Sequence, residues 1–394
     1  MIASVTPEKI VVIGGGYAGT IAANRLLQRD DVHVSLVNPR PEFVERIRLH
    51  QLAAGTGDAV IDYGTLLGED VELVVDSAER IDADARTVHL ASGRALDYDH
   101  LVYAVGSTGA TPASVPGAAE FAYDIAELEP ARRLRGELQA LPQTAPITVV
   151  GGGLTGIEIA AELAEQGRTV TVVCGRTLAP YLSEPGRRYV AKWLNRNGVT
   201  VIEGDNVTEV QAEAVVLNSG TERPSALTIW TAGFAVPGLA AASGLRTDEL
   251  GRLITDETLT SLDDERIVAA GDCAAPSGRA LRMSGYAAGP LGALAADTVL
   301  ARIAGTEPPV IDLAFTGACV SLGRRDGIRQ LGRKDDSTVD FFIRGRLGAF
   351  IKEMTCRFVI AKRIRLESRK PGAMIWIKGG PRAVAPKEAS ARTA

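Results

Sequence analysis

The sequence predicts an α/β protein with two nucleotide-binding units, because two glycine-rich turns each stand between a strand and a helix. The first turn covers residues 14–19 and the second covers residues 151–156, and both read Gly-Gly-Gly-x-x-Gly. Apolar runs over 9–13 and 147–150 precede them and are typical of buried parallel strands. In this setting the glycines let the backbone approach a pyrophosphate at the N-terminus of the following helix. We therefore expect two Rossmann-like domains, two dinucleotides and electron transfer between them.

Length and cysteine content narrow the class of protein. A chain of 394 residues exceeds one hydrophobic core, so we expect about two or three domains. No run of about 18 apolar residues predicts a membrane-spanning helix, and the first strand starts too close to Met1 for a signal peptide. The four cysteines, at 174, 273, 319 and 356, form no C-x-x-C pair. This argues against a disulfide framework, a zinc site and a dithiol redox pair, and favours a cytoplasmic setting.

Charge is unevenly distributed along the chain. From Arg344 to the end there are 13 Lys and Arg and 3 Asp and Glu, a net charge of +10, so the preceding 343 residues carry −15. An acidic body with a basic tail indicates that the tail meets an anionic surface. The four histidines show no metal-ligand spacing, and nothing in the sequence predicts a nucleic-acid interface.

The remaining elements follow in an order that places the second unit inside the first. Strands are expected over 32–37, 71–76 and 97–107, and a proline-containing crossover follows over 108–117. The second unit then repeats the strand–turn–helix–strand pattern. Residues 227–272 are interpreted as the return of the chain to the first domain.

The order of the motifs resembles that of the pyridine nucleotide oxidoreductases, flavoproteins that hold two dinucleotides. The resemblance covers about residues 8–305 and rests on the two glycine turns together with Ala104-Val105-Gly106-Ser107, Thr231-Ala232-Gly233 and Gly271-Asp272. Within this family the chain looks most like the type II NADH dehydrogenase group, which passes electrons from a nicotinamide to flavin and on to quinone. The resemblance implies an FAD domain of residues 1–112 and 226–310, an inserted NAD(P)H domain of residues 113–225 and a C-terminal module of residues 311–394.

The first glycine turn is expected to hold FAD. Asn38 stands where the family usually has an acid on the adenosine ribose; its amide can bond the same hydroxyls, and an ordinary turn residue is the alternative. Asp272 is expected on the ribitol chain, with a helix cap as the alternative. The helix that starts near Arg282 would direct its N-terminus at the flavin and stabilise negative charge on the reduced ring.

The second glycine turn is expected to hold the nicotinamide nucleotide. Arg176 follows the next strand and favours pairing with a 2′-phosphate, hence NADPH, while a solvated arginine is an equal alternative. We therefore write the cofactor as NAD(P)H. By the resemblance, Glu158 faces the nicotinamide ribose and the flavin; otherwise it complements the helix dipole.

Residues 46–51 occupy the place where disulfide reductases of the family carry their cysteine pair. No cysteine stands there, so electrons must pass directly from the flavin to an acceptor. Arg48 and His50 are expected to line that acceptor site, with Glu158 as the third candidate catalytic residue. For His50, an ordinary packed residue is the alternative.

The C-terminal region bears on which electron acceptor the protein uses. Between Phe341 and Leu366 apolar residues fall close to one helical stripe, and seven Lys and Arg residues crowd the remainder. Such a helix can lie on an anionic bilayer, as the C-terminal region of the resembled group does, or pack its stripe on the core. Residues 286–290 read Tyr-Ala-Ala-Gly-Pro where the group usually has glutamines beside the quinone, which weakens the quinone assignment.

The predicted reaction is hydride transfer from NAD(P)H to FAD, followed by electron transfer to a quinone-like acceptor, in a protein that lies in the cytoplasm or peripherally on the inner face of the membrane. The alternatives are a soluble reductase with a small-molecule or ferredoxin-type acceptor, and a slow redox sensor similar to apoptosis-inducing factor. The residues expected at the two cofactors are Gly14, Gly16, Tyr17, Ala18, Gly19, Asn38, Arg48, Ala104, Gly106, Ser107, Gly151, Gly153, Leu154, Thr155, Gly156, Glu158, Arg176, Gly233, Gly271 and Asp272.

Overall fold

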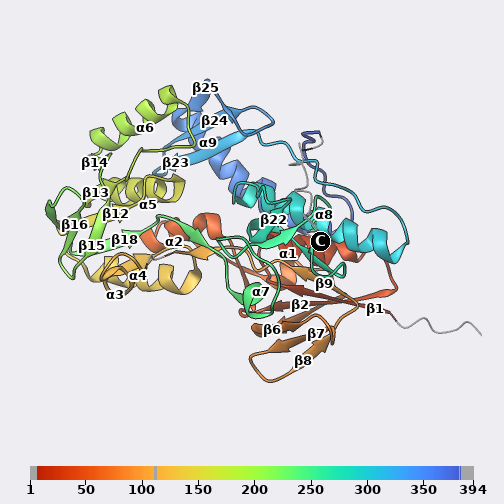
Figure 1. Cartoon of the computed structure of the whole chain (residues 1–394). Coiled ribbons are helices and arrows are strands. Elements are labelled where there is room, and N and C mark those ends of the chain that lie inside the picture. The colour runs from red at the N-terminus through yellow and green to blue at the C-terminus, as the bar shows by residue number, and fades with distance from the viewer. Residues whose placement is uncertain (1–6, 111–112, 381, 383–394) are drawn as a thin grey trace, which may run out of the picture.

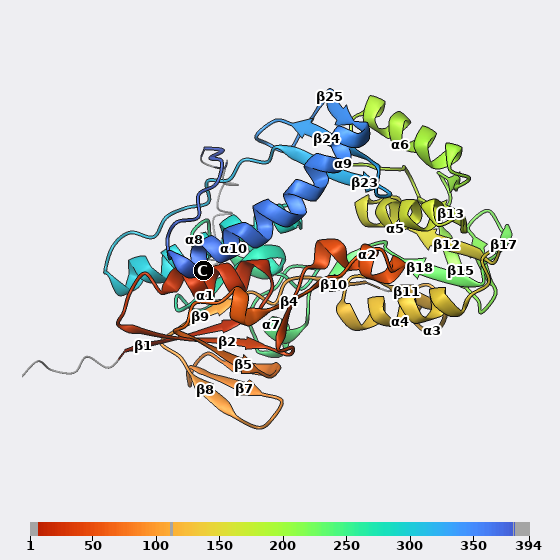
Figure 2. The same cartoon turned by 180° about the vertical axis from the view of Figure 1, so that it is seen from behind.

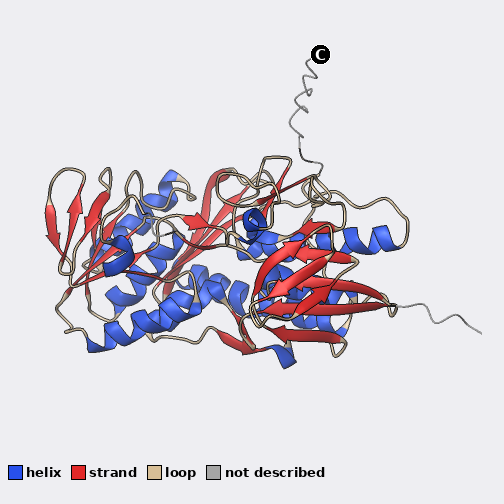
Figure 3. Ribbon diagram, turned by 60° about the horizontal axis from the view of Figure 1, so that its bottom comes forward, coloured by secondary structure: helices blue, strands red, loops and turns tan. Residues whose placement is uncertain are grey.

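The computed structural model of the chain describes residues 7–110, 113–380 and 382 (Figure 1). Two parallel sheets form the centres of two halves, and a third, antiparallel sheet with the C-terminal helices packs against elements of both (Figures 1 and 2). Helices surround the strands of the two halves (Figure 3). This α/β architecture with parallel sheets confirms the predicted fold class.

The first sheet has five parallel strands in the order β21-β9-β1-β2-β5. These strands are β21 (Ile267–Ala269), β9 (His100–Tyr103), β1 (Glu8–Ile13), β2 (Val32–Asn38) and β5 (Val71–Val75). Helices α1 (Tyr17–Leu26) and α8 (Gly285–Ile303) pack side by side on this sheet. Residues 10–13 of β1 are at most 4% exposed, as expected for a strand of a parallel sheet that is covered on both faces.

The second sheet repeats this construction in the order β11-β18-β12-β13-β14. Its parallel strands are β11 (Ala122–Asp124), β18 (Leu227–Trp230), β12 (Pro146–Val150), β13 (Thr169–Val173) and β14 (Thr200–Ile202). Helices α4 (Leu128–Ala140), α5 (Leu154–Glu165) and α6 (Glu184–Arg196) surround it.

The expected boundary at residues 225/226 needs a correction. Residues 227–230 form β18, which pairs with β11 and β12 inside the second sheet. The chain therefore returns to the first half after Trp230, not before Leu227. The apolar run Leu-Thr-Ile-Trp suits a buried strand of either sheet, so its sequence alone does not decide between them.

Two short strands join the halves at the crossover. β10 (Thr108–Gly109) and β19 (Phe234–Ala235) pair in antiparallel fashion, so the outgoing and returning chains run side by side. The remaining short elements are β3 (Glu42–Val44), η1 (Arg46–Arg48), α2 (Leu49–Ala54), β4 (Val60–Asp62), η2 (Tyr63–Thr65), β6 (Ala78–Asp82), β7 (Thr87–Leu90), β8 (Ala95–Asp97), α3 (Ala118–Phe121), β15 (Val207–Val210), β16 (Ala214–Leu217), β17 (Glu222–Pro224), α7 (Leu239–Ala242), β20 (Leu253–Thr255), η3 (Gly271–Cys273) and β22 (Ala274–Pro276).

The C-terminal region is not the single helix that its apolar stripe predicts. Residues 338–344 form β25, the edge strand of an antiparallel sheet with β23 (Gly317–Leu322) and β24 (Asp326–Gly332). Helix α9 (Gly345–Met354), a π-helical turn (Thr355–Ile360) and α10 (Ala361–Arg369) follow. The run Phe341-Phe342-Ile343 has high β-propensity, and pairing with β24 satisfies its backbone. The helical spacing of the apolar residues therefore wrongly predicted a helix for residues 341–344, which form a strand.

A buried ion cluster fixes α10 to the first half. Arg25 of α1 lies 2.7 Å from Asp297 and 3.1 Å from Glu367, whose carboxyl group is fully buried. Glu367 also accepts hydrogen bonds from the backbone N–H groups of Gly372 and Met374. This part of the basic tail therefore packs on the protein itself. Among the described residues, none of the helices has the length and apolar character that a membrane span requires.

Candidate active site

The predicted motifs gather at the carboxyl edges of the two parallel sheets, where ligands of α/β proteins bind. At the first sheet, β1 leads into Gly14, β9 into Ala104 and β21 into Gly271. At the second sheet, β12 leads into Gly151 and β13 leads toward Arg176.

The first glycine turn leaves the N-terminus of α1 open. Gly14 has a φ of +102°, and a Cβ atom there would lie 2.4 Å from the carbonyl oxygen of Ala104. A Cβ atom on Gly19 would lie 1.8 Å from the carbonyl oxygen of Gly14, so both positions require glycine. At Gly16, by contrast, a Cβ atom would meet nothing within 4 Å, and α1 begins there with no side-chain cap. Uncapped N–H groups beside open space fit a pyrophosphate.

The second turn has the same geometry. A Cβ atom on Gly151 would lie 2.5 Å from the Thr231 hydroxyl oxygen, and one on Gly156 would lie 2.1 Å from the carbonyl oxygen of Gly151. Gly153 again faces open space at the uncapped start of α5. Leu154 and Thr155 form the first turn of α5 and are half-buried. The glycine turns at residues 14–19 and 151–156, called the first and second cradles below, therefore have the same shape, and each suits one dinucleotide.

Beside the first cradle, Tyr17 and Ala18 start α1 and are buried. The Tyr17 ring packs edge-on against Phe43 with centroids 5.2 Å apart. Its hydroxyl group is buried and makes no hydrogen bond to any described residue. Such an orphan donor commonly marks a place where a ligand or water completes the bonding.

Asn38 supports the first glycine turn through a hydrogen bond to its backbone. Its Oδ1 accepts a hydrogen bond from the N–H of Gly15 at 3.0 Å, and its Nδ2 donates to the carbonyl oxygen of Arg40. Tyr63, which the sequence did not single out, donates from its hydroxyl to the carbonyl oxygen of Gly15 at 2.6 Å. The Asn38 amide is thus engaged within the chain, and a bond to ribose stays a proposal.

Asp272 ties three segments together at the end of the first sheet. Its carboxylate accepts hydrogen bonds from the Ser107 hydroxyl at 2.8 Å and from the Ser284 N–H at 3.1 Å. Arg46 in turn donates to the Ser107 oxygen at 3.0 Å. Ser107 ends the segment of Ala104 and Gly106, and Gly271 has a φ of +79°.

Of the other two predicted cofactor residues, Arg176 lies in the second half and Gly233 lies in the crossover. Arg176 is exposed beyond the end of β13, and its side chain makes no ion pair or hydrogen bond to the described residues. It is therefore free to meet a ligand. Gly233, with a φ of +85°, lies near Ala110 and follows Thr231, whose hydroxyl borders the second glycine turn.

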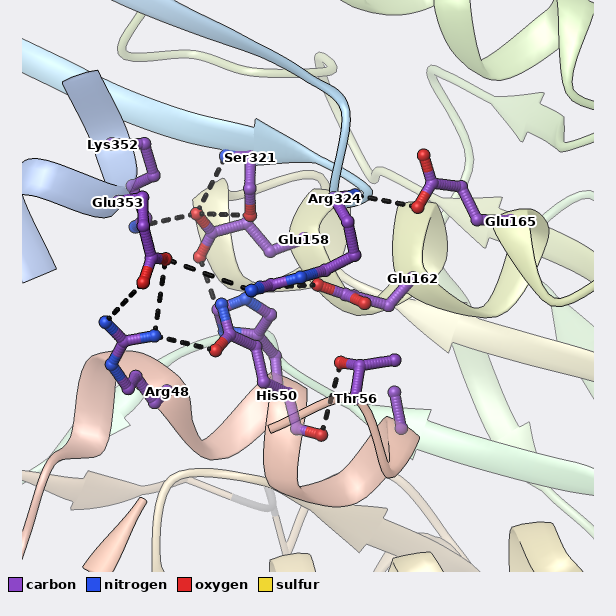
Figure 4. A network of polar contacts seen from close by, with 12 residues as sticks. Arg48, His50, Thr56, Glu158, Glu162, Glu165, Ser321, Arg324, Lys352 and Glu353 are labelled. Carbon is purple, nitrogen blue, oxygen red and sulfur yellow. Dashed lines mark hydrogen bonds and ion pairs between the residues drawn. The ribbon is translucent and has the colours of Figure 1, made fainter. Parts of the chain in front are cut away.

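The three candidate catalytic residues meet in one buried polar network (Figure 4). Glu158, on α5, lies 2.8 Å from the Lys352 amine and 3.7 Å from Nδ1 of His50. The backbone N–H and the hydroxyl of Ser321 also donate to Glu158, at 3.0 and 3.2 Å. The network therefore joins α2 of the first half, α5 of the second half and the C-terminal region.

A ring of arginines and carboxylates surrounds this centre. Arg48 donates to Glu45 at 3.0 Å, to Gln51 at 2.9 Å and to Glu353 at 3.1 Å. Arg324 lies 3.6 Å from Glu162 and 3.9 Å from Glu353. These contacts hold α2 against α9 and the turn between β23 and β24.

Burial and ion pairing set the protonation states at the centre. Burial lowers the pKa of His50 to about 4, against the opposing effect of Glu158, so the imidazole is neutral at neutral pH. Burial alone would raise the pKa of Glu158, but Lys352 and His50 outweigh it and hold that pKa below its usual value. The pKa of Lys352 is raised in turn, because Glu158 outweighs the effect of burial. At neutral pH the centre therefore holds a carboxylate and an ammonium group in contact.

Lys352, Ser321 and Glu353 are among the residues of this network that sequence reasoning missed. All three belong to the C-terminal region, where Lys352 was one cation among many in a stripe expected to face solvent or lipid. Nothing in the local pattern distinguishes Lys352 from its neighbours, since its buried position depends on how α9 packs on the antiparallel sheet. No group of His, Cys, Asp and Glu within the described part of the chain is arranged to hold a metal ion.

Comparison with known proteins adds to this geometry. The family model for pyridine nucleotide-disulphide oxidoreductases matches residues 8–290. An NADH dehydrogenase-like protein of Mycobacterium tuberculosis is 34% identical over 294 residues, covering 68% of this chain and 73% of that protein. A type II NADH:quinone oxidoreductase of Staphylococcus aureus is 26% identical over 392 residues, covering 88% of this chain and 94% of that protein. The solved structure of the sulfide:quinone oxidoreductase of Aquifex aeolicus has a TM-score of 0.79 at 20% identity, with 93% of each chain covered, and so shares the fold.

Proposed function

Because this chain belongs to the pyridine nucleotide-disulphide oxidoreductase family, it is an oxidoreductase that uses FAD and NAD(P)H, and we propose that its electron acceptor is a quinone. The domain division supports two facing cofactors: FAD at the first cradle and the nicotinamide nucleotide at the second. FAD held at the first cradle would supply the chemistry of hydride uptake from NAD(P)H and of two-electron transfer to the acceptor. The residues of the chain supply binding, orientation and protons.

The observation that carries the proposal is the buried pair of Glu158 and Lys352 next to a segment without cysteine. Residues 46–51 supply arginine, histidine and glutamine where a dithiol would stand, so electrons have no disulfide to enter. Quinone reduction instead needs a proton donor at the acceptor. Glu158 and Lys352, in contact at 2.8 Å and shielded from water, are groups that can hold and pass a proton.

A narrow apolar pocket suits the acceptor. It lies where the start of α8, α1 and the C-terminal segments meet, and it is lined by Tyr17, Ile21, Gly285, Tyr286, Gly289, Thr355, Arg363 and Met374. Almost all of its surface is apolar and its volume is about 40 Å³, so it suits a small apolar part of a quinone better than a polar substrate and does not enclose a whole ring. Tyr286 and Gly289 stand here in place of the glutamines that the resembled group carries.

The test of this function is a stopped-flow experiment on the FAD-loaded protein. NADH and NADPH are mixed with the protein in turn, and the loss of flavin absorbance gives the preferred donor. The reduced protein is then mixed with ubiquinone and menaquinone analogues, and with a ferredoxin as the alternative acceptor. We expect fast bleaching and fast reoxidation by at least one quinone. Slow reoxidation by every quinone would remove the quinone assignment, and reoxidation by the ferredoxin alone would favour a soluble reductase.

We also propose that the C-terminal module contacts an anionic membrane surface. Phe341 at β25 and Leu347 and Phe350 on α9 are 61%, 57% and 60% exposed, and Arg344 and Arg346 lie among them. Exposed apolar side chains interspersed with cations are typical of interfacial binding.

The double substitution Leu347→Ser and Phe350→Ser is expected to lower binding to phosphatidylglycerol vesicles at least about tenfold, because each buried apolar side chain contributes about 1.5–3 kcal/mol. Co-sedimentation with vesicles measures the bound fraction. Leu262→Ser, at a residue 50% exposed in the first half, is the matched control. Equal binding of the double variant and the wild type would contradict the proposed surface.

A further inference from the structure

A polar cavity opens beside the buried network. It has a volume of about 480 Å³, enough for several water molecules, and its lining includes Arg48, Gln51, Thr56, Arg324 and Arg365. Its surface is mainly polar, unlike that of the apolar pocket beside α8. Arg324, which lines this cavity, forms an ion pair with Glu162 of α5 at 3.6 Å (Figure 4).

Glu162 is a buried acid without adequate partners. Its side chain is 1% exposed, and neither carboxylate oxygen makes a hydrogen bond to the described residues. Among the described residues, the Arg324 guanidinium, 3.6 Å away, is the counter-charge of Glu162, and it also faces Glu353 at 3.9 Å. An unbonded buried carboxylate costs folding free energy, so its presence calls for an explanation other than packing.

Glu162 also lies on the same helix face as Glu158, the central residue of the buried network. It lies four residues after Glu158, so both side chains project from the same face of α5. From α2, Nδ1 of His50 lies 3.7 Å from Glu158, and its Nε2 is buried without a hydrogen bond to the described residues. Glu162 and His50 thus each have a buried polar atom that can form a further hydrogen bond, and both lie next to Glu158.

We propose that Glu162 carries protons from the water of the polar cavity to Glu158, and thereby supplies the proton that quinone reduction takes from solution. The inference rests on the proposed function. The overall reaction is NADH + H⁺ + quinone → NAD⁺ + quinol, so two electrons and one proton come from the nicotinamide as a hydride and the second proton comes from solution. Glu162 acts through Glu158 and does not touch the acceptor.

The charges around Glu162 suit this role. Burial raises the pKa of the Glu162 carboxyl, and Glu165 on the same helix adds to this, while Thr56 and Arg324 oppose it. Beyond these, the centre presents the carboxylate of Glu158, the neutral His50 and the ammonium group of Lys352, and the outer ring presents Arg48 and Glu353. A carboxyl with a raised pKa takes up a proton more readily at neutral pH than an exposed one.

The test compares Glu162→Gln with the wild type and with Glu137→Gln, which makes the same change at an exposed position of α4. Reduction by NADH and reoxidation by a quinone are recorded separately between about pH 5.5 and pH 8.5. We expect Glu162→Gln to leave reduction unchanged and to slow reoxidation about tenfold at the alkaline end, with a smaller effect at the acid end. Formate, a small acid able to enter the cavity, should restore much of the rate. The Glu137→Gln variant should behave as the wild type.

A second readout does not depend on bound FAD. Since a raised pKa means that the folded state holds the Glu162 proton more tightly, the wild-type protein loses stability as pH rises from the usual carboxyl range toward that raised pKa. The melting temperature of Glu162→Gln should therefore gain on that of the wild type as pH rises through this window. Glu137→Gln should show no such gain.

The outcomes separate the inference from the proposed function. Slow reoxidation with formate rescue, together with the pH-dependent gain in stability, supports the inference. A Glu162→Gln protein that a quinone reoxidises with the wild-type rate and pH profile overturns the inference alone. Uniform slowing at every pH without rescue also overturns it, because a purely structural role predicts that result. A wild-type protein that no quinone reoxidises overturns the proposed function and this inference with it.

Discussion

Replacing Lys352 with methionine is expected to lower the free energy of unfolding by about 3–5 kcal/mol at neutral pH, because it leaves the Glu158 carboxylate buried without its cation. Methionine keeps the apolar stem of lysine, so packing changes little. The two bonds from Ser321 remain, but hydrogen bonds alone do not neutralise a charge that is almost excluded from water. His50 compensates only in part, since burial remains the largest effect on its pKa and favours the neutral imidazole even without Lys352.

The loss should depend on pH in a defined direction. In the wild type, Lys352 helps to hold the pKa of Glu158 below its usual value, so the stability that the pair provides is present at neutral pH and is lost as pH falls through that pKa. Without Lys352, burial raises the pKa of Glu158. The difference between Lys352→Met and wild type should therefore be largest at neutral pH and shrink as pH falls through the lowered pKa of Glu158, below which both proteins carry a protonated Glu158.

Urea unfolding at several pH values measures this difference, and a double variant supplies the control. Glu158→Gln together with Lys352→Met removes both charges, so it should recover much of the lost stability at neutral pH. A single Lys352→Met variant as stable as the wild type at neutral pH would mean that the ammonium group does not balance Glu158. In that event the proton-holding pair invoked for quinone reduction would also lose its basis.

The sequence predicted the parts of the fold whose signal is local. Each glycine turn carries its own evidence, because a Cβ atom at Gly19 or Gly156 would collide with the carbonyl oxygen of the first glycine of the same turn. The strands that precede the turns bury residues 10–13 and 147–150, which therefore read as apolar runs. These features are fixed within about twenty residues, so a single sequence is enough to find them.

The predictions that were wrong or incomplete concern features that depend on contacts between distant segments. Leu227–Trp230 is apolar in either sheet, and only its pairing with β12 assigns it to the second one. Phe341–Arg344 fits a helical stripe as well as a strand, and its pairing with β24 decides the outcome. Lys352 follows the same rule, since a cation in a basic tail becomes the partner of Glu158 only after α9 has packed. The candidate site was therefore predicted on its α2 and α5 sides and missed on its C-terminal side.

Replacing Glu367 with alanine is expected to release α10 and the segment that follows it from the first half. The substitution removes the 3.1 Å ion pair with Arg25 and the two bonds that Glu367 accepts from Gly372 and Met374. Because the Glu367 carboxyl group is fully buried, removing it leaves these donors unsatisfied, at a cost of about 3–5 kcal/mol. Asp297 still pairs with Arg25, which keeps α1 and α8 together. The loss of stability should therefore be largest in α10 and the segment that follows it, and smaller in the first sheet.

Hydrogen exchange localises this effect. Amide protection over residues 361–380 should fall sharply in Glu367→Ala, while β1 and β12 keep theirs. Trp376, which packs near Arg25 and donates to the carbonyl oxygen of Asp312, should report the release by a shift in fluorescence. The control is Glu184→Ala, which breaks an exposed pair with Arg188 and should cost no more than about 1 kcal/mol. Met374 and Arg363 line the apolar pocket, so quinone reoxidation should slow in Glu367→Ala even where the flavin is still reduced at the wild-type rate. Unchanged protection over 361–380 would show that the apolar contacts of α10 hold the segment without the buried charge.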